Sequence, residues 1–239
     1  MTLTPAPRNG LPQGESTRKF AMMERKTILA HRGLFLDEAD KNSAGALVRA
    51  LEHGFGFETD VRDLNGRLVI SHDPPLEQAQ PPELRWLLER IAQSASCGRI
   101  ALNVKADGLT AAIAELVDTV GVNREQIYVF DMAVPDCLAY LNSAISTYTR
   151  ISDYEEQPAF VGRAQGVWVD DFTGAFPQVQ RAEELLGQGI RAAIVSPELH
   201  GRDHKQLWES ILAAGLHRHP LFELCTDHPA EAASLFCES

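Results

Sequence analysis

Apolar and polar positions along the chain form short runs that predict strands alternating with helices. Apolar runs bounded by Gly, Pro or Asn are typical of strands, and apolar residues three and four positions apart are typical of helices. We predict strands at 26–31, 55–62, 67–72, 99–105, 126–130, 144–150, 166–170, 190–196 and 220–226. We predict helices at 43–53, 83–93, 109–120, 135–142, 178–186 and 204–214, and a short closing helix. Because this alternation indicates parallel βαβ units, the pattern predicts a (β/α)8 TIM-type barrel.

The Asn65-Gly66 pair predicts a tight hairpin between the second and third strands, which makes the barrel irregular at this point. The alternation along the second strand places Glu58 and Asp60 on one face. With a two-residue turn, His72 would fall one position away from that face. We therefore expect a bulge or a three-residue turn that brings His72 near Glu58.

Polar residues recur at the carboxyl ends of the predicted strands. They are His31, Glu58, Asp60, Asn103, Lys105, Asp131, Arg150, Asp170, Ser196 and Asp227. Charged groups at these positions cost desolvation energy unless a ligand, ion or partner satisfies them. Barrel enzymes place their sites at this end of the strands, so the pattern predicts a site there.

Charge and composition exclude several classes of partner. The chain has 239 residues and a formal net charge of −11, which argues against nucleic-acid or anionic-membrane binding. No apolar run approaches the length of a membrane span, so we expect no integral membrane contact. The four scattered cysteines predict free thiols in a cytoplasmic protein. We interpret residues 1–26 as a flexible tail and 27–239 as one barrel domain.

The paired carboxylates suggest a site for a divalent cation. Glu58 and Asp60 offer hard oxygen ligands, Asn103 can add a neutral carbonyl oxygen, and Asn42 or water can complete the shell. Ligation by oxygen alone suits Mg²⁺ or Ca²⁺ better than zinc. The alternative is a strand edge whose acids are simply solvated.

Proton transfer and anion binding have candidates in the same stretch. His31 and His72 titrate near neutrality, so they could give and take one proton each across a site. Arg32 and Lys105 offer the positive charge that a phosphoryl oxygen needs. Lys105 could instead, or in addition, form a salt bridge to Glu58 or Asp60.

The motifs that hold these residues resemble those of the glycerophosphodiester phosphodiesterase family. They are HRG at 31–33, KNS at 41–43, GFGFETDVRD at 54–63, GRLVISHD at 66–73, ALNVK at 101–105 and LCTDHP at 224–229. The resemblance implies a barrel with Mg²⁺ or Ca²⁺ on Glu58 and Asp60. It implies that His31 and His72 act as general base and acid and that Arg32 and Lys105 touch the phosphate of a small-molecule phosphodiester. In such enzymes a substrate hydroxyl often attacks its own phosphorus.

The chain departs from the family pattern at Asn103, where members commonly carry an acidic metal ligand. The loss of one negative charge weakens cation binding or suits a substrate with more negative charge. Outside the recognised motifs, Arg150, Trp168 and Asp170 would suit a polar polyol or sugar headgroup, with ordinary packing as the alternative. Among the remaining histidines, His200 lies at a strand end and is the best candidate for a role in the site.

Three functions remain open from the sequence. The first is a metal-dependent phosphodiesterase that acts on a small, soluble, polyol- or sugar-linked phosphate. The second is a barrel that binds a phosphorylated ligand without turning it over, which the neutral Asn103 suggests. The third is a Schiff-base lyase with Lys105 as the nucleophile.

Overall fold

The computed structural model describes residues 22–94 and 96–237. Of the expected tail at 1–26, residues 1–21 lie outside the described residues. Its last part is described: Met23 is buried in the hydrophobic core, and Arg25–Thr27 forms a 3₁₀ turn, η1, that leads into the first strand.

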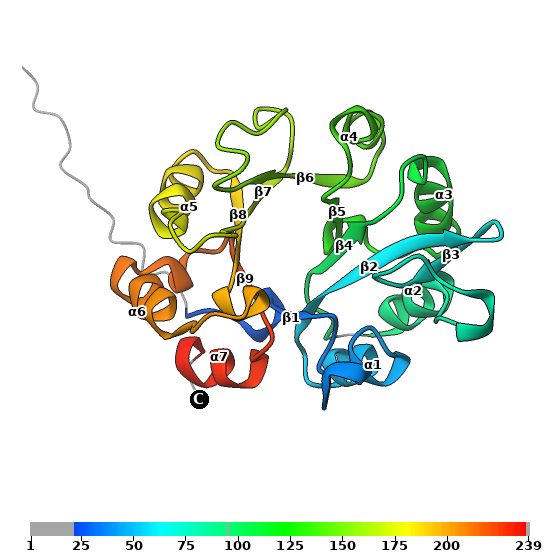
Figure 1. Ribbon diagram of the computed structural model, residues 1–239, viewed down its shortest axis with the longest axis horizontal. Helices are drawn as coiled ribbons and strands as arrows, with labels where there is room; N and C mark the ends of the chain where they lie inside the picture. The colour runs from blue at the N-terminus through cyan, green and yellow to red at the C-terminus, as the bar shows by residue number, and fades with distance from the viewer. Residues whose placement is uncertain (1–21, 95, 238–239) are drawn as a thin grey trace, which may run out of the picture.

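Eight parallel strands form a closed barrel (Figure 1). The strands are β1 (Ile28–His31), β2 (Gly56–Leu64), β4 (Ile100–Val104), β5 (Ile127–Phe130), β6 (Ser146–Ile151), β7 (Gly166–Val169), β8 (Arg191–Val195) and β9 (Phe222–Thr226). Their order around the barrel is β1-β9-β8-β7-β6-β5-β4-β2, and pairing of β1 with β2 closes it. The predicted fold class is therefore confirmed.

The ninth strand, β3 (Arg67–Ile70), pairs antiparallel with β2 outside the closed ring. Its register is regular, from Leu64 opposite Arg67 to Val61 opposite Ile70, so the turn contains two residues. The predicted hairpin is confirmed, but the expected bulge or three-residue turn is wrong. Asn65 and Gly66 both take positive φ values, 49° and 78°, and this turn already matches the twist of the two strands.

In the described part of the chain, seven α-helices pack around the outside of the barrel (Figure 1). They are α1 (Ala44–Glu52), α2 (Leu84–Gln93), α3 (Thr110–Val120), α4 (Val134–Leu141), α5 (Gln178–Gly187), α6 (Lys205–Ala214) and α7 (Pro229–Phe236). Further 3₁₀ turns are η2 (Glu38–Asp40), η3 (Glu77–Ala79), η4 (Arg124–Gln126), η5 (Pro197–His200) and η6 (Leu216–Arg218). Residues 152–165, all of them described, connect β6 to β7 without an α-helix.

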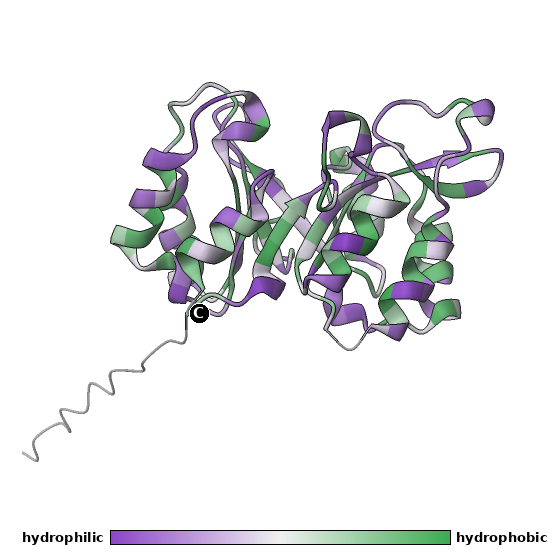
Figure 2. Ribbon diagram, turned by 90° about the horizontal axis from the view of Figure 1, so that it is seen from below, coloured by the Kyte–Doolittle hydropathy of each residue, from purple (hydrophilic) through white to green (hydrophobic). Residues whose placement is uncertain are grey.

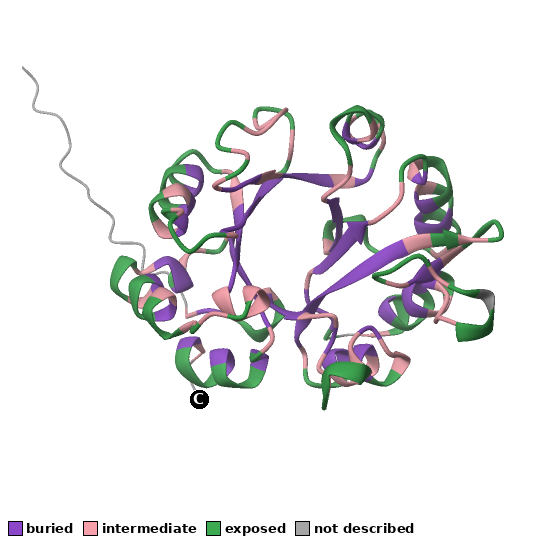
Figure 3. Cartoon of the chain, in the orientation of Figure 1, coloured by how far each residue is buried: buried purple, intermediate pink, exposed green. Residues whose placement is uncertain are grey.

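The core has two layers separated by the strands. The outer layer joins strands to helices, and Figure 2 shows the hydrophobic strands in the middle with hydrophilic residues on the outer helices. The inner layer fills the barrel, where Tyr128 stacks on Tyr148 at 3.8 Å and Phe130 stacks on Trp168 at 4.0 Å between ring centres. The strands are buried while most connecting loops are exposed (Figure 3). The barrel interior is therefore packed, and polar side chains gather at its ends.

The described part of the chain contains no helix that is both long and apolar enough to cross a membrane. The four cysteines, all within the described residues, are free thiols, as the sequence predicts.

Candidate active site

A sharp turn after β1 places the first site residues at the carboxyl end of the barrel. Arg32 and Gly33 have φ values of 56° and 89°, and a Cβ on Gly33 would lie 2.7 Å from the carbonyl carbon of Ala46 in α1. The amide of Asn42, itself at φ 61°, donates to the carbonyl of Arg32 at 2.9 Å. This packing against the start of α1 directs His31 and Arg32 to the barrel mouth.

His31 forms a hydrogen-bonded pair with Asp227, which follows β9. Its Nδ1 lies 2.7 Å from Asp227 Oδ1, and Lys41 Nζ lies 3.1 Å from Asp227 Oδ2. Burial opposes ionisation of Asp227, but the hydrogen bond from His31 and the charges of His31 and Lys41 outweigh it and lower its pKa. Because an ionised Asp227 accepts the Nδ1 proton, a neutral His31 keeps its free lone pair on Nε2. That nitrogen lies 3.9 Å from Glu58 Oε2.

Glu58 and Asp60 are buried next to each other on β2, with 2% and 0% of their surface exposed. Glu58 Oε2 accepts the amide of Arg32 at 3.3 Å. Asp60 Oδ2 accepts Asn42 Nδ2 at 2.8 Å and pairs with Arg32 Nε at 3.2 Å. Burial and the negative charge of Asp60 raise the pKa of Glu58 to about 7. A further positive charge beside these acids would therefore stabilise their ionised forms.

Asn103 lies opposite Asp60 in the pairing of β2 with β4. Among the described residues, neither Asn103 Oδ1 nor Asp60 Oδ1 has a hydrogen-bond partner, although both oxygens are buried. Unsatisfied buried acceptors are costly, and a cation that takes oxygen ligands would satisfy both. The described residues hold no cluster of three His, Cys, Asp or Glu with metal-binding geometry. Glu58, Asp60 and Asn103 nevertheless offer oxygen donors, the ligand type that Mg²⁺ and Ca²⁺ prefer.

Lys105 lies between two carboxylates at the mouth. Its Nζ is 3.5 Å from Asp60 Oδ1 and 3.7 Å from Asp131 Oδ2. Asp131 also pairs with Arg150, whose Nε lies 3.5 Å from Glu155 Oε2. The salt bridge expected as an alternative for Lys105 is therefore present with Asp60. It does not exclude contact with a phosphate, because the Lys105 side chain is still 20% exposed.

Trp168 and Asp170 have different surroundings from each other. Trp168 is buried inside the barrel against Phe130, which agrees with the packing alternative. Asp170 Oδ1 lies 2.8 Å from His200 Nε2. The His200 ring also contacts Phe172, with 5.0 Å between ring centres. His200, singled out by its strand-end position, therefore lies at the mouth.

His72 is the predicted site residue that the structure does not bring to the acids. Its side chain is 45% exposed and its Nδ1 lies 2.9 Å from Asp73 Oδ1. Across the described residues its side chain has no hydrogen bond or ion pair with Glu58 or Asp60. The regular hairpin explains this, because it lacks the extra residue that would have turned His72 inward. Arg62 donates to the carbonyls of both His72, at 2.9 Å, and Lys105, at 2.8 Å, so the two segments are tied together.

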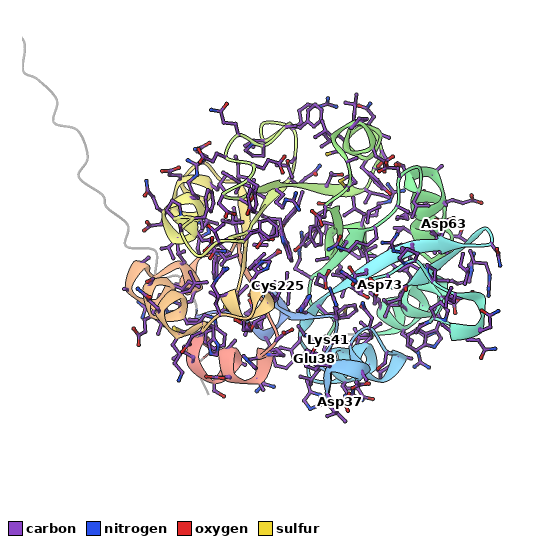
Figure 4. The ribbon with its side chains drawn as sticks, in the orientation of Figure 1. Asp37, Glu38, Lys41, Asp63, Asp73 and Cys225 are labelled. Atoms are coloured by element: carbon purple, nitrogen blue, oxygen red, sulfur yellow. The ribbon has the colours of Figure 1, made fainter. Side chains whose placement is uncertain are left out.

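Three contributors were not assigned a role from the sequence. Asp227 stands at a strand end and within LCTDHP, but its pairing with His31 joins residues 196 positions apart. Lys41 lies beside Glu38 on the loop before α1 (Figure 4), with 3.0 Å between Nζ and Oε2. Arg62 is the third. The strand-end position of Asp227 was a usable sign that it belongs to the site. Its pairing with His31 could not be predicted, because it depends on β1 lying next to β9.

No family model matches the chain, and no curated protein matches it in sequence. Solved structures match it in fold. A candidate glycerophosphodiester phosphodiesterase from Galdieria sulphuraria is 17% identical with a TM-score of 0.68, over 87% of this chain and 96% of the other. A glycerophosphodiester phosphodiesterase from Agrobacterium tumefaciens is 17% identical with a TM-score of 0.64, over 87% and 99%. A glycerophosphoryl diester phosphodiesterase from Parabacteroides distasonis is 15% identical with a TM-score of 0.63, over 92% and 89%. The chain therefore has the (β/α)8 fold of structures named as glycerophosphodiester phosphodiesterases.

Proposed function

We propose that this protein is a divalent-metal-dependent phosphodiesterase that hydrolyses a small, soluble, polyol- or sugar-linked phosphodiester. The observation that carries the proposal is the pair of buried oxygens on Asp60 and Asn103 that accept no hydrogen bond from the described residues, beside a His31 imidazole held by Asp227. The names of the structures that share the fold support the same reaction class.

In this proposal Glu58, Asp60 and Asn103 would hold Mg²⁺ or Ca²⁺. A cation bound there would supply neutralisation of the charge on the phosphoryl oxygens. A divalent cation together with two carboxylates and a neutral amide would carry no net charge, and Arg32 and Lys105 add positive charge beside them. A phosphodiester anion then meets less repulsion than it would beside three acids, and the cation is held less tightly.

His31 is the general base. Its Nε2 takes the proton from the attacking hydroxyl, which belongs either to water or to the substrate itself. Asp227 holds the ring through Nδ1 and stabilises the imidazolium that forms. Asp227 is thus a positioning residue, and Lys41 fixes its second oxygen.

Arg32 and Lys105 bind the non-bridging phosphate oxygens. Both now pair with Asp60, and both remain partly exposed at the mouth. We assign protonation of the leaving oxygen to His72. This role requires the imidazole to leave Asp73 and turn toward the mouth when substrate binds.

The test is hydrolysis of bis(p-nitrophenyl) phosphate with Mg²⁺ or Ca²⁺. We expect turnover that EDTA abolishes and that His31→Ala lowers by about a hundredfold or more, because the general base is lost. His53→Ala, at the exposed end of α1, is the matched control and should leave the rate unchanged. Full activity in EDTA or in His31→Ala would reject the proposal.

A binding barrel without turnover is the second candidate. Two observations favour it: Asn103 is neutral, and the positively charged side chains of Arg32 and Lys105 already pair with Asp60. Tight binding of a phosphodiester, with no hydrolysis of several diesters under any divalent metal, would establish it.

The geometry speaks against a Schiff-base lyase. Lys105 ion-pairs with two carboxylates, whereas a lysine that attacks a carbonyl needs a free, neutral amine. Borohydride with a carbonyl substrate should therefore trap no adduct.

A further inference from the structure

A cavity of about 1190 Å³ lies at the end of the barrel opposite the mouth. Each segment that lines it directly precedes a strand or contains its first residue. Residues 22–27 precede β1, 96–99 precede β4, 123–126 precede β5, and 217–220 precede β9. The cavity is therefore separated from the catalytic residues by the packed interior of the barrel, and the proposed mechanism uses none of its side chains.

The cavity is basic in an acidic protein. Its charged lining residues are Lys26, Arg99, Arg124, Arg191 and Arg218, against Glu24 and Glu125. The whole chain carries a formal charge of −11. Clefts that concentrate one sign of charge attract ligands of the opposite sign, so this cavity suits an anion.

Two of the arginines have guanidinium groups available for a ligand. Arg99 is occupied, because it pairs with Glu223 at 3.1 Å and donates to the Tyr148 hydroxyl at 3.1 Å. Arg191 also pairs with Glu223, at the longer distance of 3.7 Å, and its side chain is still 31% exposed. Within the described residues Arg218 has no ion pair, and it is exposed. Arg191 is the first residue of β8, and Arg218 ends η6, the turn before β9, which pairs with β8; both residues line the cavity, and an anion with several oxygens can accept from more than one arginine.

His217 adds a requirement for a hydrogen-bond donor. Only 4% of its surface is exposed, and its Nδ1 has no partner among the described residues. One ring nitrogen is hydrogen-bonded to the backbone of Ile211, so the unpartnered Nδ1 of the neutral ring is an acceptor. A ligand hydroxyl would satisfy this buried acceptor, whose burial is otherwise costly.

We propose that this cavity is a second ligand site, which binds a small phosphorylated polyol or sugar. Its phosphate contacts Arg191 and Arg218, and one of its hydroxyls donates to His217. The volume is ample for a ligand of this size. The site does not depend on the phosphodiesterase activity proposed for the mouth.

The test is calorimetric binding of glycerol 3-phosphate to the full-length protein in the presence of EDTA. Arg191→Gln/Arg218→Gln should weaken binding by at least about tenfold, because two charge-assisted contacts are lost. Arg181→Gln, on exposed α5, is the control and should change affinity less than about twofold. The double variant could fail to fold, because loss of Arg191 removes a partner of the buried Glu223. The single variant Arg218→Gln keeps that partner, and it should still weaken binding several-fold.

Two further comparisons decide where the probe binds and what it contacts. Binding should persist in Arg32→Gln/Lys105→Gln, whose changes lie at the mouth. Loss of binding in Arg32→Gln/Lys105→Gln, together with wild-type affinity in Arg218→Gln, would overturn the proposal. Failure of the wild-type protein to bind glycerol 3-phosphate at about 10 mM would also overturn it. Sulfate lacks a hydroxyl and should bind more weakly than glycerol 3-phosphate. Equal affinity, unchanged by His217→Phe, would overturn the role of His217.

Discussion

At the scale of single residues, Glu58 and Asp60 are buried carboxylates that lower the stability of the folded protein. Both carboxylates are buried two positions apart on β2, and burial together with Asp60 raises the pKa of Glu58 to about 7. A pair of buried acids reduces stability unless a cation lies beside it. Arg32 and Lys105 pair with Asp60 and offset part of this cost, while the pKa of Glu58 stays raised.

Glu58→Gln should stabilise the metal-free protein while abolishing metal-dependent turnover. Removal of one of two like charges is expected to raise the free energy of unfolding at pH 8 by about 1 to 3 kcal/mol. Chemical denaturation in EDTA measures this. Glu52→Gln, exposed on α1, serves as the control. A destabilised Glu58→Gln variant would mean that the carboxylate is a structural element.

Asp227→Asn tests the pairing that positions the base. An amide at this position no longer requires the proton on Nδ1 of His31, so the lone pair on Nε2 is lost in part of the molecules. We expect kcat to fall about a hundredfold with little change in KM. Asp63→Asn is a matched control on the hairpin, away from Lys41 and Cys225 (Figure 4). Equal effects of the two changes would remove Asp227 from the mechanism.

His217 makes stability depend on pH at the opposite end of the barrel. Burial and the charge of Arg218 lower the pKa of His217, so the folded state resists the proton that the unfolded state takes up. The free energy of unfolding should therefore fall as pH drops through about 6.5, the usual His pKa. His217→Gln should reduce this fall between pH 7.5 and 5.5, whereas the exposed His53→Gln should not. Parallel curves for wild type and His217→Gln would contradict the prediction.

At the scale of elements, the turn after β1 fixes both His31 and Arg32. Gly33 has a φ of 89°, and a Cβ there would meet the backbone of Ala46 and Leu47 at 2.7 to 2.9 Å. Only glycine combines this conformation with this close approach. The HRG turn and the start of α1 therefore act as one structural unit.

Gly33→Ala should destabilise the protein by about 2 to 4 kcal/mol, because it adds a clash to an unfavourable φ. Gly189→Ala is the matched control. It also has a positive φ, 76°, but its Cβ would meet nothing within 4 Å, so it should cost about 1 kcal/mol. Thermal or chemical unfolding measures both. Equal losses would show that the contact with α1 is not what requires glycine.

Local patterning predicted these elements well because each one is encoded within a few residues. The Ser43 cap and the Asn65-Gly66 turn are both read from neighbours in the sequence. Glu58, expected near a strand end, instead lies inside β2, which continues to Leu64 in the hairpin. The register beyond the hairpin was misjudged, because a bulge was expected from chemistry rather than from the turn residues. The position of His72 therefore differs from the expectation.

At the scale of the whole molecule, closure of the barrel assembles the site from distant segments. β1 pairs with both β2 and β9, and this double pairing brings Asp227 to His31 and Glu58 to Arg32. The order of strands predicts such a ring but not which side chains meet across it. For the same reason the basic cavity, built from segments that precede β1, β4, β5 and β9, was not foreseen.

The central claim is that a cation on Glu58, Asp60 and Asn103 serves phosphodiester hydrolysis at the barrel mouth. The most direct test measures the rate of bis(p-nitrophenyl) phosphate hydrolysis against Mg²⁺ or Ca²⁺ concentration for wild type and Asn103→Asp. We expect saturation in the cation for both and a half-saturating concentration about tenfold lower for Asn103→Asp, because a third carboxylate binds the cation more tightly. A rate that ignores the cation, or identical half-saturation in the two proteins, would contradict the account.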